Sequence, residues 1–111
     1  MAYSIIIKLA AKHLILYRNG LPLKYFLIGI GKTATPTPAG MYYIANKRPN
    51  PGGPFGVMWL GLNQPHYGIH GTNNPASIGH LVSHGCIRMY NRDVLELARF
   101  VSIGTPVRII N

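Results

Sequence analysis

Glycine and proline interrupt this chain so often that long helices are excluded from most of it. Thirteen glycines and nine prolines fall among 111 residues, and they separate short runs rich in Ile, Val, Tyr and Thr. Short runs of this composition between turn residues are typical of strands. The sequence therefore predicts a mainly β fold, a sandwich or barrel of short strands, in one domain that spans residues 1–111.

Six of these runs are predicted strands, and they lie at residues 3–8, 13–18, 22–30, 41–47, 57–62 and 106–110. Asn19-Gly20 favours a two-residue hairpin turn, so the first three strands are expected to form a meander. Residues 31–40, with Thr-Pro-Thr-Pro, and residues 48–56, with three prolines and three glycines, are predicted loops. Proline cannot donate a hydrogen bond to a strand ladder.

One segment near the C-terminus, at residues 92–101, has the period of a helix. Asn91 is placed to cap its first turn and Gly104 to end it. Its apolar residues recur at positions i, i+3, i+4 and i+7, and they are Val94, Leu97, Ala98 and Val101.

The charge of the chain is strongly positive, with eleven Lys and Arg against two acidic residues and a formal net charge of +9. Such a surface attracts polyanions, whether nucleic acid, a membrane surface or the anionic polymers of a bacterial wall. The cations are scattered singly, without a basic run or a zinc-finger spacing, which argues against specific recognition of nucleic acid.

The sequence also predicts no insertion into a membrane. Ile5, Ile6 and Ile7 are followed at once by Lys8, so the apolar run is far shorter than the roughly 20 residues that span a bilayer. No basic segment precedes this run as in a secretory signal. We expect either that the mature form starts here or that export uses another route.

The acidic residues argue against one class of enzyme. Asp93 and Glu96 lie three positions apart on the predicted helix, whereas a glycosidase needs two carboxyls about 5–10 Å apart across its substrate. We expect them to cap the helix and to pair with Arg92 or Arg99.

The most reactive group in the chain is its single cysteine, within Ser83-His84-Gly85-Cys86. One cysteine cannot form an intramolecular disulfide, so Cys86 is either a small buried hydrophobe or a candidate nucleophile. Nearby histidines and Arg88 favour the thiolate form, which supports the second interpretation.

The motif residues around Cys86 resemble those of a known family. His70-Gly71, a spacer and residues 83–88, Ser-His-Gly-Cys-Ile-Arg, follow the pattern of the L,D-transpeptidases with a YkuD-type catalytic domain. Residues 37–40, Thr-Pro-Ala-Gly, and Phe55-Gly56 with Trp59 are similar to secondary landmarks of that family. The resemblance extends over nearly the whole chain.

Proton transfer from Cys86 needs a histidine, and the residues allow two. His84 lies at i−2, on the same face of an extended strand as Cys86, whereas the resemblance implies that His70 is the proton acceptor and that His84 supports it. The group that orients this histidine is expected to be a backbone carbonyl or a neutral side chain such as Asn73, Asn74 or Ser77. The resemblance places that carbonyl near Gly71.

The substrate follows from the resemblance, which implies a peptidoglycan stem tetrapeptide. Cys86 would attack the L-centre carbonyl of the diamino acid, release D-alanine and pass the acyl group to an amine, or to water in an L,D-carboxypeptidase. Backbone N–H groups of Gly85 and Cys86 could form the oxyanion hole. Candidate substrate contacts are Arg88, which suits a carboxylate, and Ser83, Thr72 and Trp59.

Other readings of the same residues remain open. His70, His80, His84 and Cys86 could form a Cys-His₃ zinc site, but their spacing matches no common zinc module, and we expect no metal and no cofactor. His13, His66 and His80 are expected to be ordinary surface residues. The alternatives to transpeptidation are another cysteine peptide hydrolase and a non-catalytic, basic wall-binding module. The resemblance implies a location at the cell wall, outside the cytoplasm or associated with spores.

Overall fold

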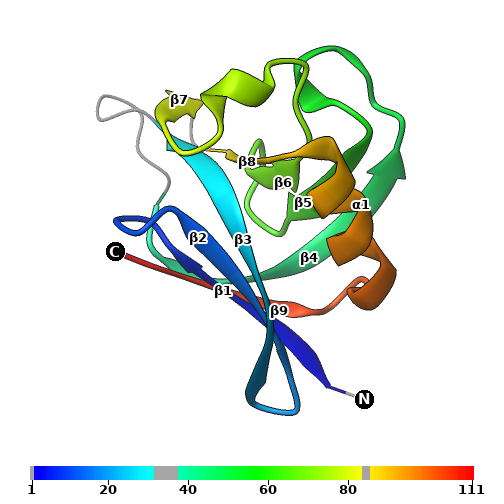
Figure 1. Cartoon of the computed structure of the whole chain (residues 1–111). Helices are drawn as coiled ribbons and strands as arrows, with labels where there is room; N and C mark the ends of the chain where they lie inside the picture. The colour runs from blue at the N-terminus through cyan, green and yellow to red at the C-terminus, as the bar shows by residue number, and fades with distance from the viewer. Residues whose placement is uncertain (1, 32–37, 84–85) are drawn as a thin grey trace.

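The computed structural model describes residues 2–31, 38–83 and 86–111, and their course is shown in Figure 1. These residues form nine strands, one α-helix and two short 3-10 turns, so the mainly β fold with one helix near the C-terminus is confirmed. The elements are β1 (Tyr3–Lys8), β2 (His13–Arg18), β3 (Leu21–Gly31), β4 (Gly40–Pro49), η1 (Gly53–Phe55), β5 (Met58–Leu62), β6 (Gly68–His70), η2 (Pro75–Ser77), β7 (Leu81–Ser83), β8 (Ile87–Met89), α1 (Asn91–Phe100) and β9 (Pro106–Ile110).

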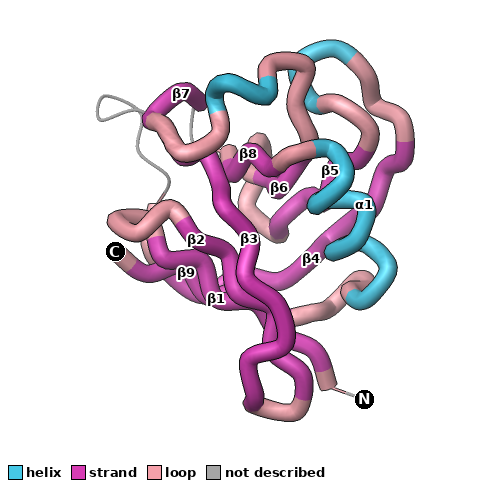
Figure 2. The backbone as a smooth tube through the Cα atoms, viewed as in Figure 1, coloured by secondary structure: helices cyan, strands magenta, loops and turns pink. Residues whose placement is uncertain are grey.

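Eight of the strands close into a barrel-like ring. The order is β2-β1-β9-β4-β5-β6-β8-β3. Strand β3 also pairs with β2, which closes the ring, and the ninth strand, β7, pairs with β3 outside the ring. The long strand β3 makes this possible because its first part pairs with β2 and its end pairs with β8 and β7. Figure 2 shows β3 running from the β2 side of the molecule to β7 and β8.

The meander at the N-terminus forms where the sequence predicts it. Asn19 and Gly20 both have positive φ angles, of 52° and 82°, which is the backbone shape that a two-residue hairpin of this type requires. Arg18 consequently pairs with Leu21 across the turn. This hairpin sets the register of β2 against β3 next to the turn, and the register shifts once, between Leu16 and Tyr17.

The core fills the inside of the ring with aliphatic side chains. Buried residues alternate with more exposed ones in β1, β8 and β9, whereas β2 and β5 each bury three residues in a row. Burying each large aliphatic side chain contributes about 1.5–3 kcal/mol. The largest fully buried side chains are Ile5, Ile7, Leu14, Leu16, Ile28, Ile44, Leu60, Ile69, Ile87, Met89, Leu97 and Ile109.

Helix α1 begins one residue before the predicted position and ends at Phe100 rather than at residue 101. Asn91 is not its cap, because the N-cap residue is Tyr90 and no side chain caps the helix. The apolar face of α1, with Val94, Leu97 and Ala98 buried, packs over β5 and β6. The helix therefore covers the strands that lead to the site described below.

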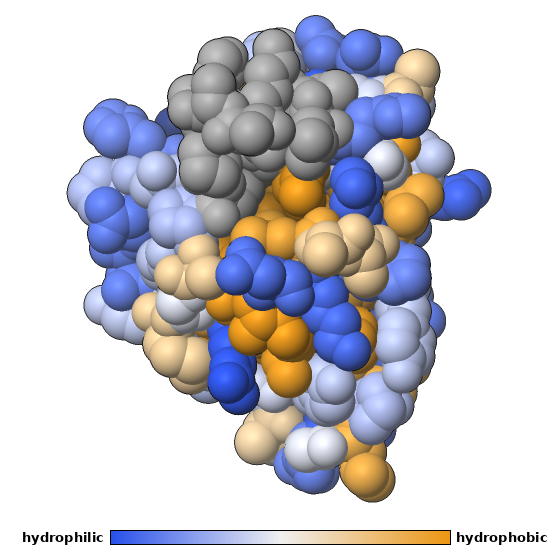
Figure 3. All heavy atoms as spheres, turned by 90° about the vertical axis from the view of Figure 1, so that its left-hand side faces the viewer, coloured by the Kyte–Doolittle hydropathy of each residue, from blue (hydrophilic) through white to orange (hydrophobic). Residues whose placement is uncertain are grey.

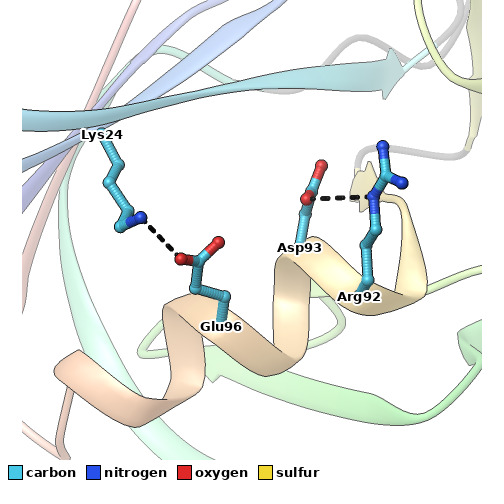
Figure 4. A network of polar contacts seen from close by, with 4 residues as sticks. All are labelled: Lys24, Arg92, Asp93 and Glu96. Carbon is cyan, nitrogen blue, oxygen red and sulfur yellow. Dashed lines mark ion pairs between the residues drawn. The ribbon is translucent and has the colours of Figure 1, made fainter.

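The two carboxylates are both engaged in ion pairs, as Figure 4 shows. Asp93 pairs with its neighbour Arg92 at 3.7 Å, as expected. Glu96 pairs with Lys24 of β3 at 2.6 Å, rather than with an arginine of its own helix. This second pair joins α1 to the barrel, a contact that requires the tertiary fold.

Three short strands, β6, β7 and β8, were not predicted from the sequence. Each has only three residues, which is too few for an alternating pattern to be recognised. They form because longer neighbours supply hydrogen-bonding partners, β5 for β6 and β3 for both β7 and β8. Within the described residues, no helix has the length and apolarity needed to cross a bilayer.

Candidate active site

The strands β6 and β8 bring His70, Cys86 and Arg88 to one surface. These strands pair in parallel, with Ile69 opposite Ile87 and His70 opposite Arg88. Ile69 and Ile87 point into the core, so the residues on either side of them face the opposite way. His70, Cys86 and Arg88 accordingly line the same cavity, which has a volume of about 920 Å³.

His70 is buried, with 2% of its surface exposed, and its ring is held by the next residue in the chain. Nδ1 donates a hydrogen bond to the Gly71 carbonyl oxygen over 2.5 Å. A carbonyl only accepts, so the neutral ring carries its proton on Nδ1 and leaves the Nε2 lone pair available. Burial is the main cause that lowers the pKa of His70 from 6.5 to about 4; the Gly71 hydrogen bond acts against it, and the positive charge of Arg88 adds to it.

Two aromatic rings enclose His70. Trp59, its register partner on β5, stacks on the imidazole with a centroid separation of 5.5 Å and an angle of 12°. Phe55 meets both rings edge-on at 5.1 Å. Gly68 makes room for this arrangement, since a Cβ there would lie 2.6 Å from Trp59 Cζ2. The aromatic rings exclude water from His70 and so contribute to its low pKa.

Cys86 is a buried thiol whose Sγ donates to the His66 carbonyl oxygen at 3.3 Å. Burial raises the pKa of Cys86, while the Gly68 backbone hydrogen bond and the charge of Arg88 lower it by less. The expectation that cationic neighbours favour the thiolate is therefore corrected, because desolvation outweighs them. At neutral pH the resting pair is a thiol and a neutral imidazole.

Arg88 is held by Ser77, which does not itself line the cavity. Its Nη1 donates to Ser77 Oγ over 3.0 Å, and Ser77 Oγ donates to the Asn74 carbonyl oxygen over 2.7 Å. The Nε of Arg88 is buried, and no acceptor for it is found among residues 2–31, 38–83 and 86–111. A buried donor of this kind is suited to an anionic ligand in the cavity.

Thr72 is 1% exposed, and its backbone and side chain each make a hydrogen bond beside the site. Its backbone N–H donates to Asn91 Oδ1 over 2.9 Å, and its Oγ1 accepts the backbone N–H of Asn74 over 2.9 Å. These bonds were not found by sequence analysis, which assigned Asn91 to the helix cap. No local pattern signals a bond between residues 19 positions apart.

The remaining candidates are the other motif residues and the other histidines. His84, Gly85 and the side chain of Ser83 lie outside the described residues, so their roles stay predictions. His66 is exposed, as expected, and it also lines the cavity, where its backbone carbonyl oxygen accepts a hydrogen bond from Cys86. His13 and His80 are exposed. In the part of the chain that the structure describes, no three metal-ligating side chains gather into a site.

Comparison with known proteins agrees with this fold. Residues 2–109 match the L,D-transpeptidase catalytic domain family, YkuD. The chain is 56% identical over 107 residues to the putative L,D-transpeptidase YkuD of Bacillus subtilis, and the match covers 96% of this chain and 65% of that protein. The chain thus spans about two-thirds of the length of this curated relative.

Solved structures give the same result. The catalytic domain of the Enterococcus faecium L,D-transpeptidase superposes with a TM-score of 0.84 at 31% identity, covering 97% of this chain and 96% of that one. The Ldtfm–avibactam carbamoyl enzyme gives a TM-score of 0.87 at 30% identity, over 100% of this chain and 49% of that one. The chain belongs to the family of L,D-transpeptidase catalytic domains.

Proposed function

We propose that this chain is a peptidoglycan L,D-transpeptidase that uses Cys86 as its nucleophile and His70 as its proton acceptor and donor. The observation that carries the proposal is their placement in one cavity, where His70 has its proton fixed on Nδ1 and Nε2 left to accept another. The substrate is a stem tetrapeptide, at the cell wall outside the cytoplasm. Family membership supports this assignment.

Acylation begins with a proton transfer from Cys86 Sγ to Nε2 of His70 as the sulfur attacks the L-centre carbonyl of the diamino acid. A C–S bond forms and the carbonyl electrons move to oxygen, giving a tetrahedral oxyanion. When the oxyanion collapses, the C–N bond to D-alanine breaks, and the departing amine takes the proton from His70. The stem is then held on Cys86 as a thioester.

Other residues position the substrate in this scheme. Backbone N–H groups at Gly85 and Cys86 are the proposed donors to the oxyanion. Arg88 binds a substrate carboxylate, for which its buried Nε, without an acceptor among the described residues, is available. Trp59 forms part of the groove beside His70. Thr72 holds the turn at Asn74 and does not line the cavity.

Transfer completes the cycle. An amine of a second stem attacks the thioester, His70 accepts its proton, and the proton returns to sulfur as the C–S bond breaks. If water attacks instead, the same residues perform L,D-carboxypeptidase chemistry. The cavity binds anionic stem peptides, and the positive surface of the chain binds the anionic wall polymers around them.

A β-lactam of the carbapenem class tests the proposal, because acylation by its strained ring needs an activated thiol in an acyl-transfer site. We expect intact mass spectrometry to show one stable adduct per wild-type chain and none on Cys86→Ala, which fills nearly the same space. Muropeptide analysis after incubation with stem tetrapeptides should show released D-alanine and cross-linked products. An unmodified wild-type protein would contradict the proposal and favour a binding module. An adduct on Cys86→Ala would contradict it as well, because the nucleophile would then be another residue.

A further inference from the structure

The Gly71–Thr72 peptide unit lies between the imidazole of His70 and the side chain of Asn91. We propose that Asn91 is a positioning residue, which holds this peptide plane so that the Gly71 carbonyl keeps the His70 proton on Nδ1. The inference rests on the proposed role of His70 as proton acceptor. It assigns to Asn91 a part in the reaction, although its side chain comes from helix α1, outside the motif.

The two hydrogen bonds belong to one rigid unit. The carbonyl of Gly71 accepts from His70 Nδ1 over 2.5 Å, and the N–H of the same peptide unit, carried by Thr72, donates to Asn91 Oδ1 over 2.9 Å. A peptide unit is planar, so its C=O and N–H turn together. Any rotation that breaks the bond to Asn91 therefore also turns the carbonyl away from His70.

The space around Asn91 Oδ1 is tight, because Gly56 and Gly71 both lie against this atom. A Cβ added to Gly56 or to Gly71 would overlap Asn91 Oδ1, and a Cβ on Gly56 would also lie 2.5 Å from the Thr72 nitrogen. Gly56 has a φ of +66°, which further favours glycine there. On the other side, the Gly71 N–H is held by the Met58 carbonyl at 3.1 Å. Both peptide units flanking Gly71 are thus fixed.

No carboxylate of the chain takes this role. The two that exist are both on α1, where Asp93 pairs with Arg92 and Glu96 with Lys24. A neutral amide has a chemical advantage here, because a carboxylate beside the peptide would stabilise the imidazolium and raise the pKa of His70. Asn91 thereby orients the histidine through the peptide without charging it. Accepting the Thr72 N–H also strengthens the Gly71 carbonyl as an acceptor.

Three variants test the inference in the whole chain. Asn91→Leu keeps the size of the side chain but removes the acceptor, and Asn91→Asp keeps both shape and acceptor. Asn63→Leu is the matched control, because Asn63 Oδ1 also accepts a backbone N–H, that of Tyr43, over 2.9 Å, outside the cavity. The readouts are stopped-flow acylation by a carbapenem across pH and the ¹⁵N chemical shifts of His70, which report its tautomer.

We expect Asn91→Leu to slow acylation by about 10- to 100-fold, by analogy with the loss of groups that orient metal-binding histidines, with a mixed His70 tautomer. Asn91→Asp should acylate within a few-fold of wild type and move the acid limb of the rate to higher pH. Asn63→Leu should leave tautomer and rate unchanged.

Equal slowing in Asn91→Leu and Asn63→Leu, or a wild-type tautomer and rate in Asn91→Leu, would overturn the inference. If Asn91→Leu does not fold, an unmoved acid limb in Asn91→Asp would overturn it. A failure of the proposed function would be recognised by a different result: the wild-type chain itself would form no adduct with the carbapenem.

Discussion

His70 and Cys86 are both uncharged at neutral pH in this site, because burial disfavours the charged form of each. The pKa of His70 falls to about 4 and that of Cys86 rises. A pre-formed thiolate–imidazolium pair is therefore not the resting state. In the proposed mechanism the proton moves only when a carbonyl is in place to be attacked, so that His70 would act as a general base in the transition state.

The pH dependence of acylation follows from that pKa. His70 accepts a proton only while it is neutral, so the rate should fall as the pH drops through about 4, rather than through the 6.5 of an ordinary histidine. We expect a carbapenem acylation rate that is nearly level from pH 7 to pH 5, measured by stopped flow. His70→Ala should lower that rate by on the order of 10²–10⁴-fold. An acid limb near 6.5 would instead indicate a different, exposed base.

At the level of elements, the site depends on strands that could not exist alone. Strands β6 and β8 have three residues each and are held between β5 and β3, with α1 packed over β5 and β6. Lys47 of β4 binds the C-terminal end of α1. Its Nζ donates to the carbonyl oxygens of Ala98 and Val101 over 2.7 and 2.8 Å. A cation at this position also suits the negative end of the helix dipole.

Replacing the charged side chain of Lys47 should measurably lower the stability of the fold. We expect Lys47→Met to lower the free energy of unfolding by about 1–2 kcal/mol, because two hydrogen bonds from a charged donor are lost. Lys24→Met is the control: its ion pair with Glu96 is more than one-third exposed on both sides, and such pairs contribute about 0–1 kcal/mol. Urea denaturation measures both. Equal losses in the two variants would show that Lys47 acts only as a surface charge.

Across the whole molecule, the closed sheet leaves several large hydrophobic side chains exposed on its outer face. Figure 3 shows hydrophobic and hydrophilic side chains intermixed on the face that carries the C-terminus. A formal net charge of +9 favours association with polyanions. The exposed large hydrophobic residues of β3 and β4 are Leu21, Leu23, Tyr25, Leu27, Met41 and Tyr43.

Attachment to the wall should accordingly depend on salt. We expect binding to isolated sacculi to weaken steeply between low and physiological ionic strength, where charges are screened over about 8 Å. Sacculi stripped of anionic polymers should bind less at every salt concentration, and Cys86→Ala should bind as wild type does. Binding that is insensitive to salt would point to recognition by shape in the cavity instead.

Local patterns in the sequence were sufficient for the long elements. The bounds of β1, β2 and β9 agree with the predicted strands, the Asn19-Gly20 turn forms, and α1 is displaced by one residue. These features depend on residues near one another in the chain, such as turn geometry and the period of apolar side chains. The resemblance of the motif residues to the L,D-transpeptidase family also singled out His70 and Cys86, which the fold places on one cavity.

Only the tertiary structure decided the protonation of the site residues and the hydrogen bonds that hold them in place. Cationic neighbours in the sequence favour a thiolate, but closure of the barrel buries Cys86 and raises its pKa. Asn91 looks like a helix cap in the sequence, yet its oxygen bonds to Thr72, 19 residues away. Burial and contacts of this kind depend on which distant segments the closed sheet brings together, and no local pattern encodes that.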